Sequence, residues 1–452
     1  MTTTSDPLHA LYTDEAEVRS ELARVQDICH GCRQCIDLCG SFPTLFDMLD
    51  RMSKPSAGLL TPAEQDQVVS ECVHCTLCAV DCPYGPQQND RSRNGSAGNG
   101  AAAQQADVDV PRLMLRARAM QFEHGHLAGT GKKAARVLAR PDRVGRIATR
   151  VPSIANAVIG SKTGSRRRRL LARLTGVSAD RHLGTFAAQR FSAWFRERPT
   201  IKLHRRQAAV MVFPTCLVEY QATSIGKDLV KVYERNGVEC GVSSARCCGA
   251  PLLHAGDIAA FRKVAEKNLS QLATEIRDGK DIVVPQPACA HVLTVDSVEH
   301  VSSVDARVDA ALVAEHTYDA SGYLVGLHRG DDYVLDTDFE GETHRRITYQ
   351  ASSHMRARGV GYPSRDLMRL TGARIEVIQE PSGVGGIWSL RTRTDADDST
   401  TQRLAERVAA GTGGVVASDS HLASLAIAER TGMMPIHPLQ VVARAYGIPD
   451  EI

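Results

Sequence analysis

The sequence predicts an α/β protein in which a small helical module and a basic helical connector precede two similar α/β halves. Three observations lead to this prediction. Eight of the 13 cysteines lie between residues 29 and 82. From about residue 205 onward, short apolar runs alternate with helical patterns, which favours a mainly parallel sheet. The pattern that begins there recurs after residue 346, which indicates an internal repeat.

Length and composition narrow the class of protein. The 452 residues suffice for several domains, and 43% hydrophobic with 23% charged residues excludes a wholly disordered, collagen-like or coiled-coil chain. No segment is apolar for long enough to predict a spanning helix, and the first residues lack the pattern of a secretory signal. We therefore expect a cytoplasmic protein. A net charge of only +2 does not favour a nucleic-acid partner.

Two runs of cysteines with the same spacing dominate residues 1–90. Both read C-x2-C-x2-C-x3-C, the first from Cys29 to Cys39 and the second from Cys72 to Cys82 with Pro83 after it. This is the spacing of bacterial two-cluster ferredoxins, in which the fourth cysteine of each run ligates the other cluster. We therefore expect two [4Fe-4S] clusters in a ferredoxin-like domain. Their ligands would be Cys29, Cys32, Cys35 and Cys82 for the first, and Cys72, Cys75, Cys78 and Cys39 for the second.

Zinc is the alternative metal for these cysteines. Zinc ligands are usually grouped two and two, so two matching runs of four favour iron–sulfur clusters. Between the runs, Thr61-Pro62-Ala63-Glu64 predicts the start of a helix through a capping box. His30 and His74 lie inside the motifs, and we expect them on the solvent side or bonded to cluster sulfur rather than to iron.

A linker and a basic connector follow. Residues 91–106 are rich in Gly, Ala, Ser and Asn, which predicts a flexible linker. In the connector, residues 107–204, the stretch 131–173 holds 13 Lys or Arg and a single acid, Asp142. Prolines divide this stretch into short helices. It is a solvated connector or a docking face for an anionic membrane surface or an acidic partner. Nucleic-acid binding is a third alternative, but no groove-reading motif accompanies the charge.

The C-terminal part divides into a first half at 205–300, a connection at 301–345 and a second half at 346–452. Residues 208–213 and 281–285 predict strands, and 223–236 a helix. Cysteines follow these strands or lie in loops, where sites collect in open α/β sheets: Cys216, Cys247, Cys248 and Cys289. The matching positions of the second half hold no cysteine but Ser353, Pro381-Ser382 and Ser420, so we expect no cluster there.

These motifs resemble those of the heterodisulfide-reductase-related iron–sulfur proteins, which include the iron–sulfur subunits of anaerobic glycerol-3-phosphate, glycolate and lactate dehydrogenases. Their members combine a two-cluster ferredoxin domain with tandem cysteine-rich domains named CCG after a Cys-Cys-Gly motif. The resemblance rests on both cysteine runs, on Cys247-Cys248-Gly249, and on 353–357, which is similar to the family's Cys-His-Leu-Arg-Ala. It covers nearly the whole chain apart from 91–106, and it implies two CCG domains, the second here without cysteines.

The resemblance also implies a third metal centre. Each CCG motif of the family uses five cysteines to hold an unusual cluster, but here the last one is absent after Cys289-Ala290-His291. The four remaining cysteines could hold a third iron–sulfur cluster, with His291 as a further contact. The alternative is a thiol group without metal. Cys240 stands outside the motif, and we expect it to be a buried, inert thiol.

The expected function follows from the clusters. Ferredoxin-type clusters transfer single electrons, and the sequence contains neither a complete dinucleotide fingerprint nor a recognisable set of catalytic residues. The resemblance implies a subunit that relays electrons between a flavoprotein dehydrogenase, of glycerol-3-phosphate, glycolate or lactate type, and a quinone or another acceptor. Residues 131–173 would place it at the inner face of the membrane or on its partner. The alternatives are a disulfide reductase of the heterodisulfide type and a non-enzymatic redox sensor or scaffold.

Overall fold

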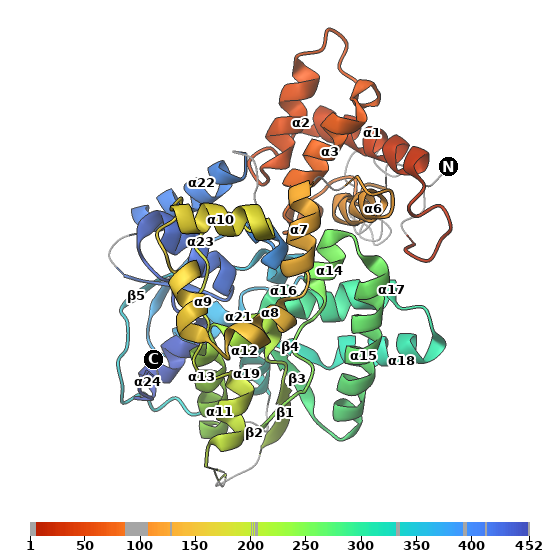
Figure 1. The fold of residues 1–452 in the computed structure, drawn as a ribbon. Helices are drawn as coiled ribbons and strands as arrows, with labels where there is room; N and C mark the ends of the chain where they lie inside the picture. The colour runs from red at the N-terminus through yellow and green to blue at the C-terminus, as the bar shows by residue number, and fades with distance from the viewer. Residues whose placement is uncertain are drawn as a thin grey trace, which may run out of the picture.

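The computed structural model describes residues 6–85, 107–126, 129–199, 201, 203, 207–330, 335–391, 396–411 and 414–450. The helices of the N-terminal module stand at one end of the molecule (Figure 1), and the two sheets with their helices form the larger body below them. The connector helices lie along one side of that body. The predicted linker at 91–106 lies outside the described residues.

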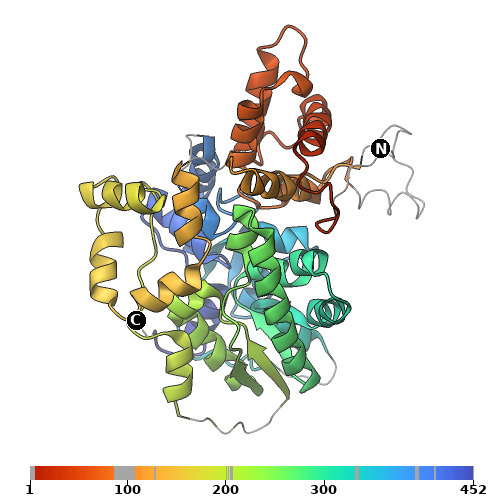
Figure 2. The same cartoon turned by 45° about the vertical axis from the view of Figure 1, so that its right-hand side comes forward.

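Short helices build the N-terminal module, as expected. They are α1 (Glu15–Cys32), α2 (Ser41–Asp50), a 3-10 turn at Ala57–Leu59, α3 (Pro62–Glu71) and α4 (Leu77–Val80). Thr61 caps α3 and Glu64 bonds back to the cap, so the predicted capping box is confirmed. Helix α6 (Val110–Glu123) shares the apolar core of this module, and it also contacts α14 of the first α/β half. Figure 2 shows α6 between the two parts.

Five further helices form the connector: α7 (Gly129–Val137), α8 (Pro141–Ala148), α9 (Pro152–Ile159), α10 (Arg166–Thr175) and α11 (Phe191–Glu197). Proline opens α8 and α9, where its missing N–H leaves no bond unmade. The arginine run of α10 is not uniformly solvated. Arg168 is buried and donates to the carbonyls of Ile159, Ser178 and Arg181, whereas its three neighbours in the run are exposed.

The first α/β half contains a parallel sheet of order β2-β1-β3-β4. Its strands are β1 (Ala208–Val212), β2 (Val238–Val242), β3 (Asp281–Val284) and β4 (Thr317–Asp319). Its helices are α12 (Thr215–Tyr220), α13 (Thr223–Arg235), α14 (Ala250–Ala255), α15 (Ile258–Arg277), α16 (Pro287–His291), α17 (Ser297–His300), α18 (Val304–Glu315) and α19 (Ala320–Arg329). A π-helical turn at Val292–Asp296 joins α16 to α17.

The second half repeats this topology. Its parallel sheet has the order β6-β5-β7, which matches β2-β1-β3. The strands are β5 (Arg346–Gln350), β6 (Arg374–Ile378) and β7 (Val415–Ser418). The helices are α20 (Ser353–Ala357), α21 (Pro363–Arg369), a 3-10 turn at Ile387–Leu390, α22 (Ala396–Ala410), α23 (His421–Thr431) and α24 (Pro438–Ala445). The shared strand order agrees with the predicted internal repeat.

In the part of the chain that the structure describes, no helix combines the length and the apolar character that crossing a membrane requires.

Candidate functional site

The cysteines of the N-terminal module form two groups, each with members from both runs. In the first group, Cys82 of the second run lies close to three thiols of the first run: Cys29, Cys32 and Cys35. All four line one small cavity. In the second group, Cys39 of the first run lies close to Cys72, Cys75 and Cys78. The groups adjoin each other, because Cys78 also lines the cavity of the first group.

Local backbone geometry turns these thiols inward. Cys29 and Cys32 lie in the last turn of α1 rather than in a loop, and Arg33 ends that helix in the left-handed region at a φ of 55°. In the second run His74 and Thr76 have φ values of 53° and 64°, so the chain folds tightly around Cys75. Residues other than glycine adopt this region infrequently, and the surrounding structure stabilises them there.

Burial is the largest influence on the pKa of Cys29, Cys72 and Cys75 and disfavours a thiolate there, although at Cys72 the charges of Arg118 and Arg391 partly offset it. Burial raises the pKa of Cys29 and of Cys75 to about 12, and that of Cys72 to about 11. Iron would supply the missing positive charge, because a coordinating thiol is deprotonated. Among the described residues, no three His, Cys, Asp or Glu side chains are arranged to hold a single metal ion. A four-iron cluster does not require three side chains that meet at one metal ion, because each thiolate binds a different iron.

A third group of thiols lies in the first α/β half. Cys216 stands at the start of α12, Cys247 and Cys248 precede α14, and Cys289 lies in α16. The sulfur atoms of Cys248 and Cys289 are 3.3 Å apart. A hydrogen bond from Cys216 raises the pKa of that thiol and lowers the pKa of Cys247.

Cys240 is separate from this group. It lies in β2, is buried, and its thiol donates to the Val238 carbonyl at 3.7 Å. This placement agrees with the expected inert thiol.

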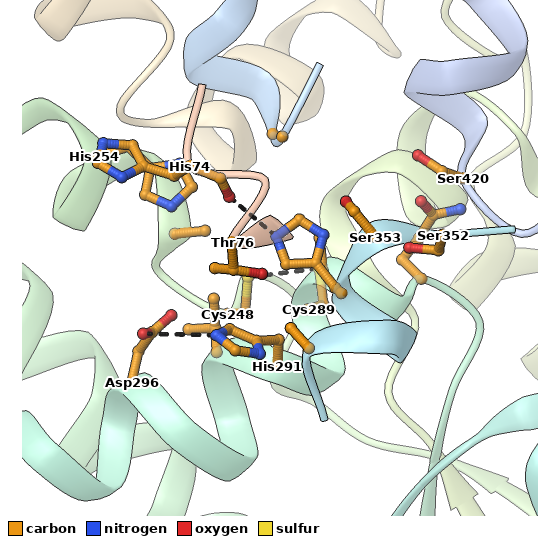
Figure 3. Close-up of a pocket in the computed structure, with 18 of the residues that line it drawn as sticks. His74, Thr76, Cys248, His254, Cys289, His291, Asp296, Ser352, Ser353 and Ser420 are labelled. Atoms are coloured by element: carbon orange, nitrogen blue, oxygen red, sulfur yellow. Dashed lines mark hydrogen bonds and ion pairs between the residues drawn. The ribbon is translucent and has the colours of Figure 1, made fainter. Parts of the chain in front are cut away.

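A cavity of about 200 Å³ lies where the second cysteine run meets both α/β halves. The first half contributes Cys216, Cys248 and Cys289, and the second contributes their predicted counterparts Ser353, Ser382 and Ser420. His74 and Thr76 close it from the N-terminal module (Figure 3). The repeat therefore brings equivalent positions of the two halves face to face, with thiols on one wall and hydroxyls on the other.

Four histidines line this cavity: His74, His254, His291 and His354. His74 stacks on His254 with ring centroids 4.6 Å apart, and the Nε2 of His354 donates to the His74 carbonyl at 3.1 Å. Burial lowers the pKa of all four below its ordinary value, so the rings are neutral. Within the described residues, neither ring nitrogen of His74 has a hydrogen-bond partner.

The histidines were only partly foreseen. His74 is 4% exposed, which excludes the solvent-side alternative for it, so the other alternative, a bond to cluster sulfur, stays a prediction. His30 is partly exposed and pairs with Asp50 at 2.8 Å. His291 lines the same cavity as the thiols, and its Nε2 lies 3.9 Å from the Asp296 carboxylate. His254 was missed. Its position six residues after Cys248 carries no signal that sequence reasoning could have used.

Two contacts hold the second cysteine run against the α/β halves. Arg118 of α6 is buried and donates to the His254 carbonyl at 2.8 Å, and also to the carbonyl of Cys72. On the other side, the backbone at Gly385 approaches so closely that a Cβ there would lie 1.8 Å from the Val73 carbonyl oxygen. These two contacts hold the loop that carries Cys75 over the cavity.

Comparisons with known proteins agree with these sites. Residues 28–86 match the family model of a 4Fe-4S dicluster domain, and residues 210–294 match that of a cysteine-rich domain, CCG. Lactate utilization protein A of Geobacillus thermodenitrificans is 30% identical over 206 residues, which are 43% of this chain and 80% of the relative. The protein of the same name from Geobacillus kaustophilus is 28% identical over 205 residues, with the same two coverages. That of Bacillus cytotoxicus is 26% identical over 218 residues, which are 46% of this chain and 86% of the relative. The chain therefore belongs to the heterodisulfide-reductase-related family of iron–sulfur proteins that includes lactate utilization protein A.

Proposed function

We propose that this protein is an electron-transfer subunit that relays electrons between a flavoprotein dehydrogenase and a quinone or another acceptor. Two [4Fe-4S] clusters would be held by the two thiol groups of the N-terminal module, and a third centre by Cys216, Cys247, Cys248 and Cys289. One observation carries the proposal. His74 and Thr76, on either side of Cys75, line the same cavity as Cys216, Cys248 and Cys289.

This arrangement supports a continuous path. Cys35 lies close enough to Cys78 to raise the pKa of that thiol, and both line one small cavity, which connects the first group to the second. The loop around Cys75 then connects the second group to the cavity. Iron–sulfur clusters bound at these positions supply one-electron transfer. The protein contributes burial, thiolate ligands and backbone N–H groups near sulfur, which together tune the potentials.

The partner is proposed from the relatives. Because they are named for lactate utilization, we favour the lactate type among the flavoprotein dehydrogenases considered above. The connector supports a position at the inner face of the membrane, since its basic helices also expose apolar side chains such as Ile147, Ile154 and Leu174. Neither a disulfide reductase nor a redox sensor accounts as directly for three thiol groups in a row.

The first experiment is the iron and acid-labile sulfide content of anaerobically reconstituted protein, with EPR of the reduced sample. About twelve irons per chain are expected for three centres, and about eight for the two clusters of the N-terminal module alone. Cys75→Ser should remove about four irons and destabilise the N-terminal module, because cluster binding is coupled to folding. Ser353→Ala is the matched control on the opposite cavity wall and should leave the iron content unchanged. Full iron content in Cys75→Ser would refute the assignment.

Two assays separate the alternatives. A reductase would be oxidised by low-molecular-weight disulfides after reduction with dithionite, and the proposed relay would not. A sensor would bind its partner with an affinity that depends on oxidation state, whereas equal affinity in both states supports the relay.

A further inference from the structure

A second cavity, of about 160 Å³, lies between the connector and the first α/β half. The connector side presents apolar side chains from successive helices, among them Val144 of α8, Ile159 of α9 and Leu171 of α10. The opposite wall is formed by Leu217 and Tyr220 of α12, with the 3-10 turn at Ile387–Leu390 beside them. We call this cavity the connector groove. Val144, Ile159 and Leu171 are only half-buried, so the groove is open to the surroundings on the connector side.

The connector groove reaches a thiol of the third group. Cys216 lines this groove and also lines the cavity that faces His74, so it forms part of the wall between the two. A molecule in the groove would therefore contact Cys216, one of the four cysteines proposed to hold the third centre. In the proposed path, electrons reach the third centre from the cavity at His74. The molecule in the groove would lie on the other side of Cys216.

Few polar side chains line the groove: Thr175, Tyr220 and Gln221. The Thr175 hydroxyl donates to the Leu171 carbonyl at 2.7 Å. Tyr220 is 1% exposed, its ring packs against the Cα of Gly145, and its hydroxyl donates to Asp142 at 2.5 Å. The Gln221 amide donates one N–H to the Gly184 carbonyl at 3.0 Å, and its second N–H can donate to a ligand carbonyl. An apolar slot with one amide donor suits a ring that carries carbonyl oxygens.

The outer face of the connector fits a lipid surface. Helix α9 buries none of its side chains although most of them are apolar. Ile154 is 68% exposed and Leu174 is 67% exposed, and the arginines 166, 167 and 169 are exposed on α10. Apolar and basic side chains together are typical of helices that lie in the interface of an anionic membrane. The groove would then open close to the place where lipid-soluble molecules are found.

We propose that the connector groove binds the ring of an apolar quinone, which receives electrons at the Cys216 side. This inference rests on the proposed function and deepens it, because it names the acceptor and gives it a site separate from the cavity at His74. In this reaction two electrons leave the reduced centres one at a time, two protons come from water, and the quinone becomes a quinol. The groove supplies an apolar environment and holds one carbonyl at Gln221.

The test uses 2,3-dimethyl-1,4-naphthoquinone as the probe. This compound has no isoprenoid tail, and both of its reactive ring carbons are blocked, so it cannot alkylate the cysteines. Leu171→Trp should fill the groove, and Val144→Trp should fill it from a different helix. Leu170→Trp is the matched control, because this neighbour is 57% exposed and does not line the groove. Equilibrium dialysis with the iron-loaded, oxidised protein measures binding independently of activity.

Reoxidation of the dithionite-reduced protein gives the second measurement, with the quinone or with hydrophilic ferricyanide as the oxidant. We expect Leu171→Trp and Val144→Trp to weaken quinone binding and to slow quinone-dependent reoxidation by about tenfold or more. Iron content and oxidation by ferricyanide should stay unchanged, and Leu170→Trp should behave like the parent. Binding that is insensitive to both filling variants would overturn the proposal. So would a bound quinone that never oxidises the protein, which would make the groove a site for apolar additives only. Absence of reducible iron would instead refute the relay itself.

Discussion

Replacing Arg118 by methionine should loosen the contact between the second cysteine run and the first α/β half. The Arg118 side chain is 4% exposed on α6. It donates to the His254 carbonyl at 2.8 Å, to the Val69 carbonyl at 3.2 Å and to the carbonyl of Cys72. One acceptor therefore belongs to α14 and two belong to the end of α3, so a single guanidinium joins the two parts.

The magnitude follows from these bonds. Methionine has a similar length and no charge, so the variant leaves no buried ion. Each of the three carbonyls loses the hydrogen bond from Arg118. A buried acceptor without a partner costs about 1 kcal/mol or more. The Val69 carbonyl keeps a second donor, the Cys72 N–H at 3.3 Å, and loses less than the other two. We therefore expect a loss of about 2–3 kcal/mol, concentrated at the contact between the N-terminal module and α14.

The control lies two residues away on the same helix. Arg116 is 2% exposed and donates to the carbonyls of Tyr12 and Leu11, both at 2.8 Å. Arg116→Met removes comparable bonds, but at the N-terminal segment. The assay is native-state amide hydrogen exchange of the iron-loaded protein. In Arg118→Met the peptides covering 69–78 and 250–256 should exchange about 30- to 150-fold faster, whereas in Arg116→Met only the segment near residue 12 should do so. Equal exchange of 250–256 in the two variants would refute the reasoning.

Two other predictions concern single positions. Burial lowers the pKa of His437 to about 4, while its Nε2 donates to the Pro285 carbonyl and its Nδ1 accepts from the Leu439 N–H. Since an unfolded histidine titrates near 6.5, this residue's contribution to stability is present above about pH 6.5 and is lost as pH falls toward about 4. In His437→Gln, the free energy of unfolding from urea titrations should fall less steeply with acidification, by up to about 1.4 kcal/mol per pH unit; an unchanged slope would contradict this. Gly385→Ala should lower the unfolding temperature through an overpacking cost of about 1–3 kcal/mol, because its Cβ would meet the Val73 carbonyl. Gly326→Ala is its control, since nothing lies within 4 Å of a Cβ there, and an equal effect of both would count against this contact.

The sequence patterns predicted those helix starts and strands that depend on residues close together in the chain. The capping box at Thr61 and the start of α8 at Pro141 depend on residues within one turn of a helix, and both were readable from the sequence. The strand expected at 208–213 lies at Ala208–Val212, and the one expected at 281–285 lies at Asp281–Val284. The internal repeat was readable for the same reason, because each half repeats a short apolar strand followed by a small residue at the site.

Contacts between distant segments were not readable. The bond from His354 to the His74 carbonyl joins residues 280 positions apart, and no periodicity encodes it. The same limit explains why a solvent-side position was one of the two alternatives expected for His74. A histidine between two cysteines of a loop is ordinarily exposed, and only the docking of the α/β halves buries it. Arg168 gives a further example. It stands in a run that resembles a charged face, yet its guanidinium donates to three carbonyls, one at the end of α9 and two in the loop between α10 and α11.

The second half without cysteines has a structural role in the same site. At the carboxyl ends of β5 and β7, the Asp419 carboxylate accepts from the hydroxyls of Tyr349 and Ser364 inside the protein. Both donors and the acceptor belong to this half, so the network forms without a metal. The backbone of the same half at Gly385 packs directly against the Val73 carbonyl in the second cysteine run. The loss of thiols from one half therefore leaves the cavity closed and the loop around Cys75 in place. It confines the proposed third centre to the opposite wall, which is the wall that separates the cavity from the connector groove.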